Sequence, residues 1–157
     1  MNEQLEPKVI QRLLSGVISH LRQTVGIDAV LAVIDDLHSA PEGIAVTLDF
    51  VGDFRGPVTW VFPEAIALEL VRRLMADPSP SPELALDGAH ELANILTGRA
   101  SGELEKFGFS CQFGVPRAHL GELPPGIKMR IATDDGPIDI VLSMSRTRRL
   151  PVVATPV

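Results

Sequence analysis

The spacing of apolar residues changes along this chain from the period of a helix to that of a strand and back again, which restricts the fold. Residues 8–25 repeat apolar side chains every three or four positions and predict a first helix that ends at Gly26. Residues 43–50 instead alternate apolar and polar side chains, as half-buried strands do. A turn sequence at 52–57 joins them to the next strand, at 58–62, in a predicted antiparallel hairpin, and a weaker strand is predicted at 28–36.

Two further helices and a second group of strands follow the hairpin. Pro63 suits the first position of a helix that is predicted to run to residue 76, where a Pro/Ser-rich connector begins. The next helix is predicted at about 83–107. Further strands are expected at 109–115, at 127–131 and at 138–144, the last two joined by a tight turn at 134–136. This order predicts an α+β fold: a single domain with a mostly antiparallel sheet and helices packed on it.

Length and charge limit the organisation and the partners of the chain. Its 157 residues suit one domain, with a core at about 8–145 and a basic, frayed tail at 146–157. The net charge of −6 argues against nucleic acid, because phosphate binding needs a basic surface. No apolar run is long enough to span a membrane, the N-terminus does not resemble a signal peptide, and the single cysteine, Cys111, fits a reducing compartment. We therefore expect a cytoplasmic protein that binds neither nucleic acid nor membrane.

Residues 90–94, His-Glu-Leu-Ala-Asn, differ at one position from the His-Glu-x-x-His signature of zinc proteases. A carboxamide is a poor zinc ligand compared with imidazole, so Asn94 does not replace the missing histidine. None of the other three histidines is paired at metal-ligand spacing. We therefore expect no metal site in this chain, and we interpret His90 as a histidine on the helix surface.

A polar stripe runs along the same predicted helix. Asp87, Glu91, Asn94 and Gly98 follow one another at i, i+4, i+7 and i+11, which places them in one line. Every amphipathic helix has a solvated polar side, and on composition alone this explanation is the simpler one. Asparagine and glycine are nevertheless both unfavourable inside a helix, and a glycine there costs about 1 kcal/mol relative to alanine. Two such residues on one face indicate that the face is used.

The side chains of this stripe suit the hydrolysis of a phosphoryl group. An amide such as Asn94 cannot act as a base near neutral pH, but its donors and its acceptor can orient a water molecule. Hydrolysis of a reactive phosphoryl group needs little more than an in-line water and charge stabilisation. A glutamate such as Glu91 only accepts hydrogen bonds when it is ionised, and then suits a cation such as a lysine of a partner protein.

The pattern Asp87-x-x-x-Glu91-x-x-Asn94, with Gly98 and the run ELANILTGRASGELEKFGFSCQFGVP, resembles the CheC/CheX/FliY family of bacterial chemotaxis phosphatases. The likeness extends from the first helix to about residue 144. The family also has a proline downstream of the asparagine, and Pro116 stands about one residue early. CheC-like members carry two Glu-x-x-Asn motifs, whereas the single motif of this chain is the CheX-like arrangement.

This resemblance implies a phosphatase that hydrolyses the aspartyl phosphate of a CheY-type response-regulator receiver domain. By analogy, Asn94 orients the attacking water and Glu91 pairs with a lysine of the receiver. Asp87, His90 and Gly98 would belong to the interface with the partner. Mg²⁺ would be held by the carboxylates of the receiver and not by this chain. The resemblance also implies a homodimer formed through sheet edges.

Two alternatives to a phosphatase remain open: a non-catalytic module that docks on a receiver, and a dimerisation domain with a relict motif. Elsewhere in the chain, Cys111 is expected to be a small buried apolar residue, because no base stands beside it in the sequence. Trp60 is expected to pack in the core. The basic run at 146–149 is interpreted as part of the solvated tail.

Overall fold

The computed structural model describes residues 2–3, 5–32, 43–74, 76 and 79–147. Its helices are α1 (Pro7–His20), continued by a π-helical turn (Leu21–Val25), α2 (Glu64–Leu74), and α3 (Ala85–Lys106), preceded by a short 3-10 turn (Pro82–Leu84). Its strands are β1 (Asn2–Glu3), β2 (Ala29–Ala32), β3 (Ile44–Gly52), β4 (Phe54–Phe62), β5 (Cys111–Phe113), β6 (Arg117–Ala118), β7 (Ile127–Thr133), β8 (Ile138–Leu142) and β9 (Ser145–Thr147). The predicted α+β class is confirmed.

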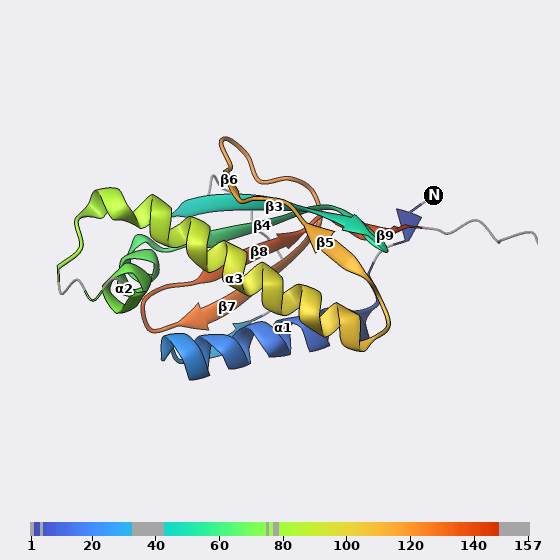
Figure 1. The fold of residues 1–157 in the computed structure, drawn as a ribbon, viewed down its shortest axis with the longest axis horizontal. Coiled ribbons are helices and arrows are strands. Elements are labelled where there is room, and N and C mark those ends of the chain that lie inside the picture. The colour runs from blue at the N-terminus through green and yellow to red at the C-terminus, as the bar shows by residue number, and fades with distance from the viewer. Residues whose placement is uncertain (1, 4, 33–42, 75, 77–78, 148–157) are drawn as a thin grey trace, which may run out of the picture.

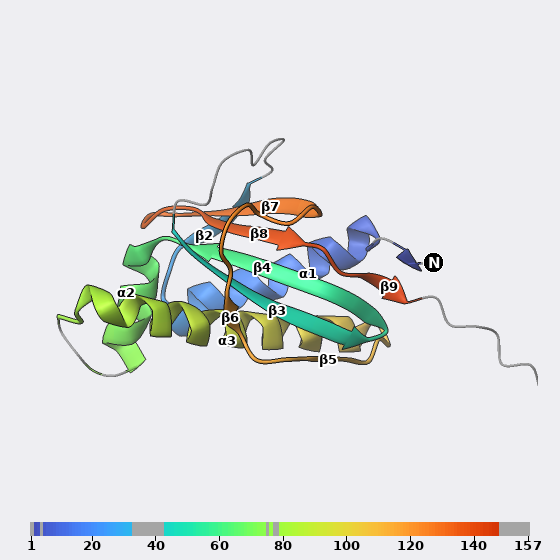
Figure 2. The same cartoon turned by 90° about the horizontal axis from the view of Figure 1, so that it is seen from above.

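The described strands join one antiparallel sheet. Its main path has the order β1-β9-β4-β8-β7-β2, and β3 pairs with β4 on one side and with β5 and β6 on the other. The predicted hairpin of β3 and β4 lies near the centre, where Val46 is opposite Trp60. Helices α1 and α3 lie side by side on one face of the sheet, and α2 packs against the N-terminal part of α3 (Figures 1 and 2).

The main core fills the space between the sheet and these helices. Strand β4 contributes Trp60 and Phe62, and α3 contributes Leu92 and Leu96, all of which are fully buried. Alternate residues of a strand point to the same face, so one strand supplies several large side chains to one core. The predicted packing role of Trp60 is confirmed.

The hairpin turn is shorter than the sequence predicted. Residues 52–57 were expected to form the turn, but β4 begins two residues after Gly52. Gly52, with a φ of 113°, lies where the chain reverses. Gly56 lies inside β4, where a side chain would come within 2.8 Å of the carbonyl oxygen of Ser143. This glycine therefore allows the segment after β8 to pass close to β4 rather than forming a turn.

The end of the described chain adds a strand that the sequence did not predict. The frayed tail was expected to start at residue 146, but β9 continues to Thr147 and pairs with β1 and with the start of β4. The guanidinium of Arg146 lies 4.9 Å from the ring centre of Phe109, a cation–π contact. Strand pairing and this contact order a segment whose composition suggests a solvated tail. The rest of the predicted tail, 148–157, lies outside the described residues.

One other strand, β5, is shorter than predicted, whereas the first helix is as long as predicted. Strand β2 forms the early part of the strand predicted at 28–36, and positions 33–36 lie outside the described residues. Strand β5 occupies only the middle of the segment 109–115. The helix predicted at 8–25 is found, with a π-helical last turn, and it ends at Gly26 in the left-handed region at φ 71°.

Candidate functional site on helix α3

Helix α3 carries the predicted polar stripe on its exposed side. Asp87, Glu91 and Asn94 are exposed, and Gly98 is partly exposed. Leu92, next to Glu91 in the sequence, is fully buried, because the helical period turns successive residues to different sides. The exposure that the spacing predicted is therefore observed. We call these four residues the α3 stripe; their roles remain predictions.

A buried hydrogen bond holds α3 in place behind the stripe. The indole Nε1 of Trp60 donates to Oγ1 of Thr97 at 3.0 Å, and both residues are fully buried. Buried polar groups need partners, so this bond fixes the rotation of the helix about its axis relative to β4. The sequence predicts only packing for Trp60, because the partner of this hydrogen bond lies 37 positions away along the chain.

Gly98 is not required by the packing of the chain itself. A methyl group at this position would have one near neighbour, the Cζ atom of Phe113 at 3.7 Å, which is an ordinary van der Waals contact. Glycine nevertheless weakens a helix by about 1 kcal/mol relative to alanine. The open space above Gly98 supports the expectation that a second surface approaches the helix backbone here.

His90 is not the surface histidine that the sequence predicted. Its side chain is partly buried, and its Nε2 is buried without a hydrogen-bond partner among the described residues. The reason is its position on the helix: it lies two turns before the buried Thr97, on the same side. His90 also lies one turn before Asn94 and therefore borders the α3 stripe.

Two cavities of the structure lie away from the stripe. One of about 360 Å³ lies between α1 and α3, and one of about 270 Å³ lies where β7 begins and β8 ends. Neither is lined by a residue of the α3 stripe. Glu91 and Asn94 are themselves exposed on the helix surface. Chemistry that needs positioned groups and excluded water would require a second molecule to close this site.

Cys111 does not offer an alternative catalytic centre. It is partly exposed, and therefore less buried than predicted, because β5 pairs only with β3 among the described strands. Burial still raises the pKa of its thiol, so the reactive thiolate is disfavoured.

In the part of the chain that the structure describes, no group of three or more His, Cys, Asp or Glu residues could hold a metal ion. None of the described helices has the length and apolar character to cross a membrane.

Comparison with known proteins connects this geometry to one family. A family model described as chemotaxis phosphatase CheX matches residues 44–127. No curated protein sequence matches the chain. Among solved structures, the chemotaxis protein CheX from Vibrio vulnificus has a TM-score of 0.71 and 20% identity, covering 90% of this chain and 99% of that chain. The CheX–CheY–BeF3–Mg²⁺ complex from Borrelia burgdorferi gives a TM-score of 0.64 and 18% identity, covering 90% of this chain and 98% of that chain.

The structural neighbours and the family model agree, the first on the fold and the second on the family. The structural likenesses, at low identity, show that the fold is shared over most of the chain. The family model matches more than half of the sequence, and the matched region contains the β3–β4 hairpin and the complete α3 stripe. The chain therefore belongs to the family of the chemotaxis phosphatase CheX.

Proposed function

We propose that this protein hydrolyses the aspartyl phosphate of a CheY-type receiver domain at the α3 stripe. The observation that carries the proposal is the exposure of Glu91 and Asn94, one turn apart, on a helix that a buried hydrogen bond fixes to the sheet. Membership of the CheX family supports a phosphatase, and one structural neighbour is a CheX–CheY complex with Mg²⁺. An open helix surface is suited to a macromolecular substrate, which supplies the other wall of the site.

In this proposal Asn94 positions the attacking water. Its amide offers an acceptor and two donors in one plane, so it can hold a water molecule without taking a proton from it. The water oxygen forms a bond to phosphorus while the bond from phosphorus to the aspartyl oxygen breaks. The carboxylate of the receiver leaves with the electron pair, and both protons of the water remain on the released phosphate. The carboxylates of the receiver would hold Mg²⁺, which would supply charge stabilisation for the phosphoryl oxygens.

Glu91 is proposed to fix the register of the two proteins. Its exposed carboxylate can pair with a lysine of the receiver, and such a charge-assisted bond would place Asn94 over the phosphoryl group. Asp87, His90 and Gly98 border these two residues on the helix. Gly98 leaves room for the backbone of α3 to be approached, and we assign these three residues to the interface rather than to the chemistry.

The test is the lifetime of a phosphorylated CheY-type receiver in the presence of Mg²⁺. The unchanged protein should shorten this lifetime, and Asn94→Ala should return the decay close to the receiver's own rate while still binding. Glu91→Ala should mainly weaken binding. The matched control is Glu105→Ala, which removes an exposed carboxylate almost four turns after Glu91 on the same helix. This variant should leave the rate of dephosphorylation unchanged.

Two results would contradict the proposed phosphatase. If the unchanged protein binds the phosphorylated receiver without shortening its lifetime, the domain is a non-catalytic binding module. If Asn94→Ala is as active as the unchanged protein, the chemistry lies elsewhere.

We also propose that two copies pair through a sheet edge, as the family resemblance implies. Strand β2 ends the main path of the sheet and pairs only with β7 among the described strands. Val30 and Leu31 on β2 are 60% and 36% exposed, which leaves apolar surface at this edge. Sedimentation should give the mass of two chains, and Val30→Lys should give one. A single-chain mass for the unchanged protein would refute the dimer.

A further inference from the structure

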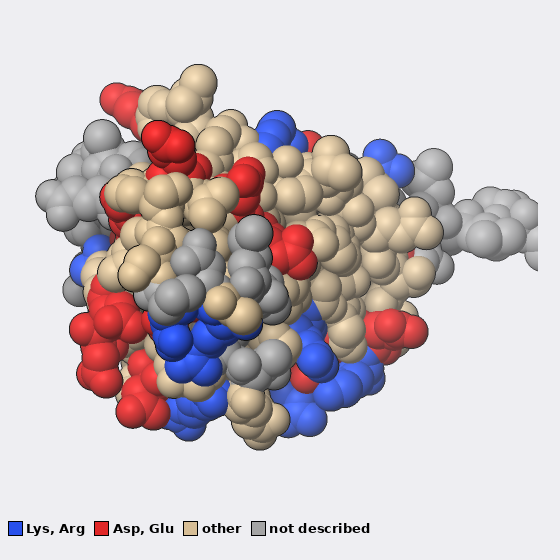
Figure 3. Space-filling model, turned by 60° about the vertical axis from the view of Figure 1, so that its left-hand side comes forward, with Lys and Arg blue, Asp and Glu red and all other residues tan. Residues whose placement is uncertain are grey.

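A groove between α1 and α3 concentrates basic side chains on a protein whose net charge is −6. It has a volume of about 360 Å³, which is within the range of small-molecule sites. Its lining includes three cations, Arg12, Arg99 and Lys106, and one carboxylate, Glu103. Figure 3 shows one side of the molecule, on which the larger groups of Lys and Arg side chains lie in the lower part of the view.

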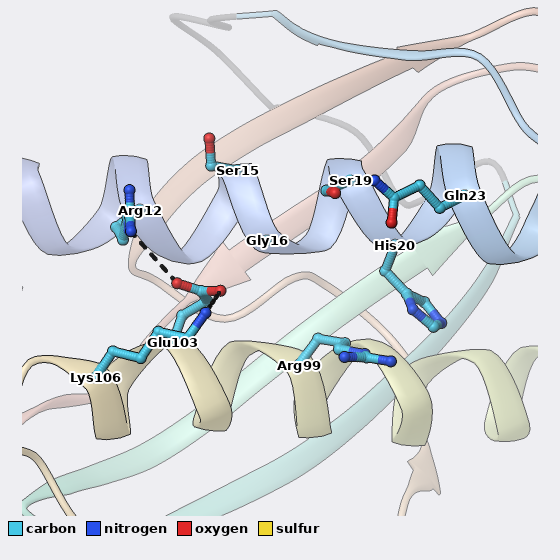
Figure 4. Close-up of a pocket in the computed structure, with 9 residues that line it drawn as sticks. All are labelled: Arg12, Ser15, Gly16, Ser19, His20, Gln23, Arg99, Glu103 and Lys106. Carbon is cyan, nitrogen blue, oxygen red and sulfur yellow. Dashed lines mark hydrogen bonds and ion pairs between the residues drawn. The ribbon is translucent and has the colours of Figure 1, made fainter.

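One end of the groove combines two cations with the carboxylate. Glu103 accepts a hydrogen bond from Lys106 at 2.9 Å and lies 3.6 Å from Arg12 on the neighbouring helix (Figure 4). Gly16 allows this arrangement, because a methyl group there would come within 2.6 Å of Cγ of Glu103. Two positive charges and one negative charge leave this end with an excess of positive charge.

The other end is formed by Arg99 and His20. Arg99 is exposed and takes part in none of the ion pairs among the described residues. His20 is only 8% exposed, and its ring reaches from α1 toward α3 beside the guanidinium (Figure 4). Burial, and then the charge of Arg99, lower the pKa of His20 and favour its neutral imidazole. A cation that pairs with none of the described carboxylates thus faces the same space as the imidazole of His20.

We propose that this end of the groove binds a small phosphate-bearing molecule. A guanidinium matches the geometry of phosphate oxygens, and the imidazole of His20 lies beside the guanidinium of Arg99 (Figure 4). Ser19 and Gln23 line the same end and supply uncharged donors. The positive end at Arg12 can accommodate a second anionic group. The burial of His20 favours a small ligand, because an acidic segment of a protein would not reach a side chain that is so little exposed.

This inference does not depend on the proposed phosphatase, because the groove contains no residue of the α3 stripe. Binding of a phosphate-bearing ligand should also change the pKa of His20. A bound anion offsets the charge of Arg99 and stabilises the imidazolium, so binding should raise the pKa of His20. The charged groups around His20 in the groove are Arg99 on α3, and, farther along, Arg12, Glu103 and Lys106.

The test is an NMR titration of the full chain with inorganic pyrophosphate, against sodium chloride at the same ionic strength. Pyrophosphate should give saturable shifts of the Arg99 and His20 side-chain signals and an increase in the pKa of His20. Arg99→Gln should weaken binding by about tenfold or more, because a charge-assisted bond is lost. The matched control is Arg55→Gln, which removes an exposed arginine of β4 outside the groove and should leave the affinity unchanged.

Three outcomes would overturn the site. The first is a linear, unsaturated shift equal to that in chloride, which indicates screening only. The second is equal loss of affinity in Arg99→Gln and Arg55→Gln, which indicates general charge attraction. The third is no binding of pyrophosphate together with weaker binding of the receiver by Arg99→Gln, which would make the groove a protein contact. Backbone spectra of both variants establish that they remain folded.

Discussion

Gly88 and Gly98 lie on the same helix, and comparison of the two regions separates a structural glycine from a candidate functional one. At Gly88 a methyl group would overlap the carbonyl oxygen of Ala67 and come within 2.8 Å of Val71, both on α2. At Gly98 a methyl group would only touch Phe113 at van der Waals distance. Both glycines weaken the helix by about 1 kcal/mol relative to alanine, but only the first is explained by packing within the chain.

The largest effect is expected from Gly88→Ala. The obstacle is a backbone carbonyl, which cannot move aside like the end of a flexible side chain, so α2 would have to shift. We expect the free energy of unfolding to fall by about 2–3 kcal/mol, the upper part of the usual range for overpacking. Urea-induced unfolding of the variant and of the unchanged protein measures this difference in free energy. An unchanged or higher stability would show that α2 moves freely, and the contrast between the two glycines would then be lost.

A smaller effect is expected from Thr97→Val, next to Gly98. Valine has nearly the same shape, but it leaves the buried Nε1 of Trp60 without its acceptor. We expect a loss of about 1–2 kcal/mol in the free energy of unfolding, the cost of an unsatisfied buried donor. Thr97→Ser retains the hydroxyl and is the matched control. If Thr97→Ser loses stability and Thr97→Val does not, the methyl group of Thr97 matters and the hydrogen bond does not.

The smallest effect, opposite in sign, is expected from Gly98→Ala. With no clash to overcome, the variant should gain up to about 1 kcal/mol in stability through helix propensity. If a receiver approaches the backbone here, the same variant should bind the phosphorylated receiver more weakly. A gain in stability with unchanged binding would exclude Gly98 from the interface and leave that glycine unexplained.

The sequence predicted the parts of the molecule that follow from local periodicity. The 3.6-residue period placed Asp87, Glu91 and Asn94 on one exposed side of α3, and the period of two located β3 and β8. Local rules were less accurate where distant segments meet. Gly56 was interpreted as part of a turn, but it lies in a strand that passes close to Ser143.

The tertiary structure alone decided the contacts between segments that are far apart in the sequence. It paired Trp60 with Thr97, and it drew β9 into the sheet. It also placed Arg99 beside His20, which formed a groove that no motif indicated. The physical reason is that a helix or strand pattern depends on the nearest few residues, whereas burial of a side chain such as His90 depends on which elements pack around it. The sequence by itself thus determined the class of fold and the line of the α3 stripe, and packing determined what surrounds them.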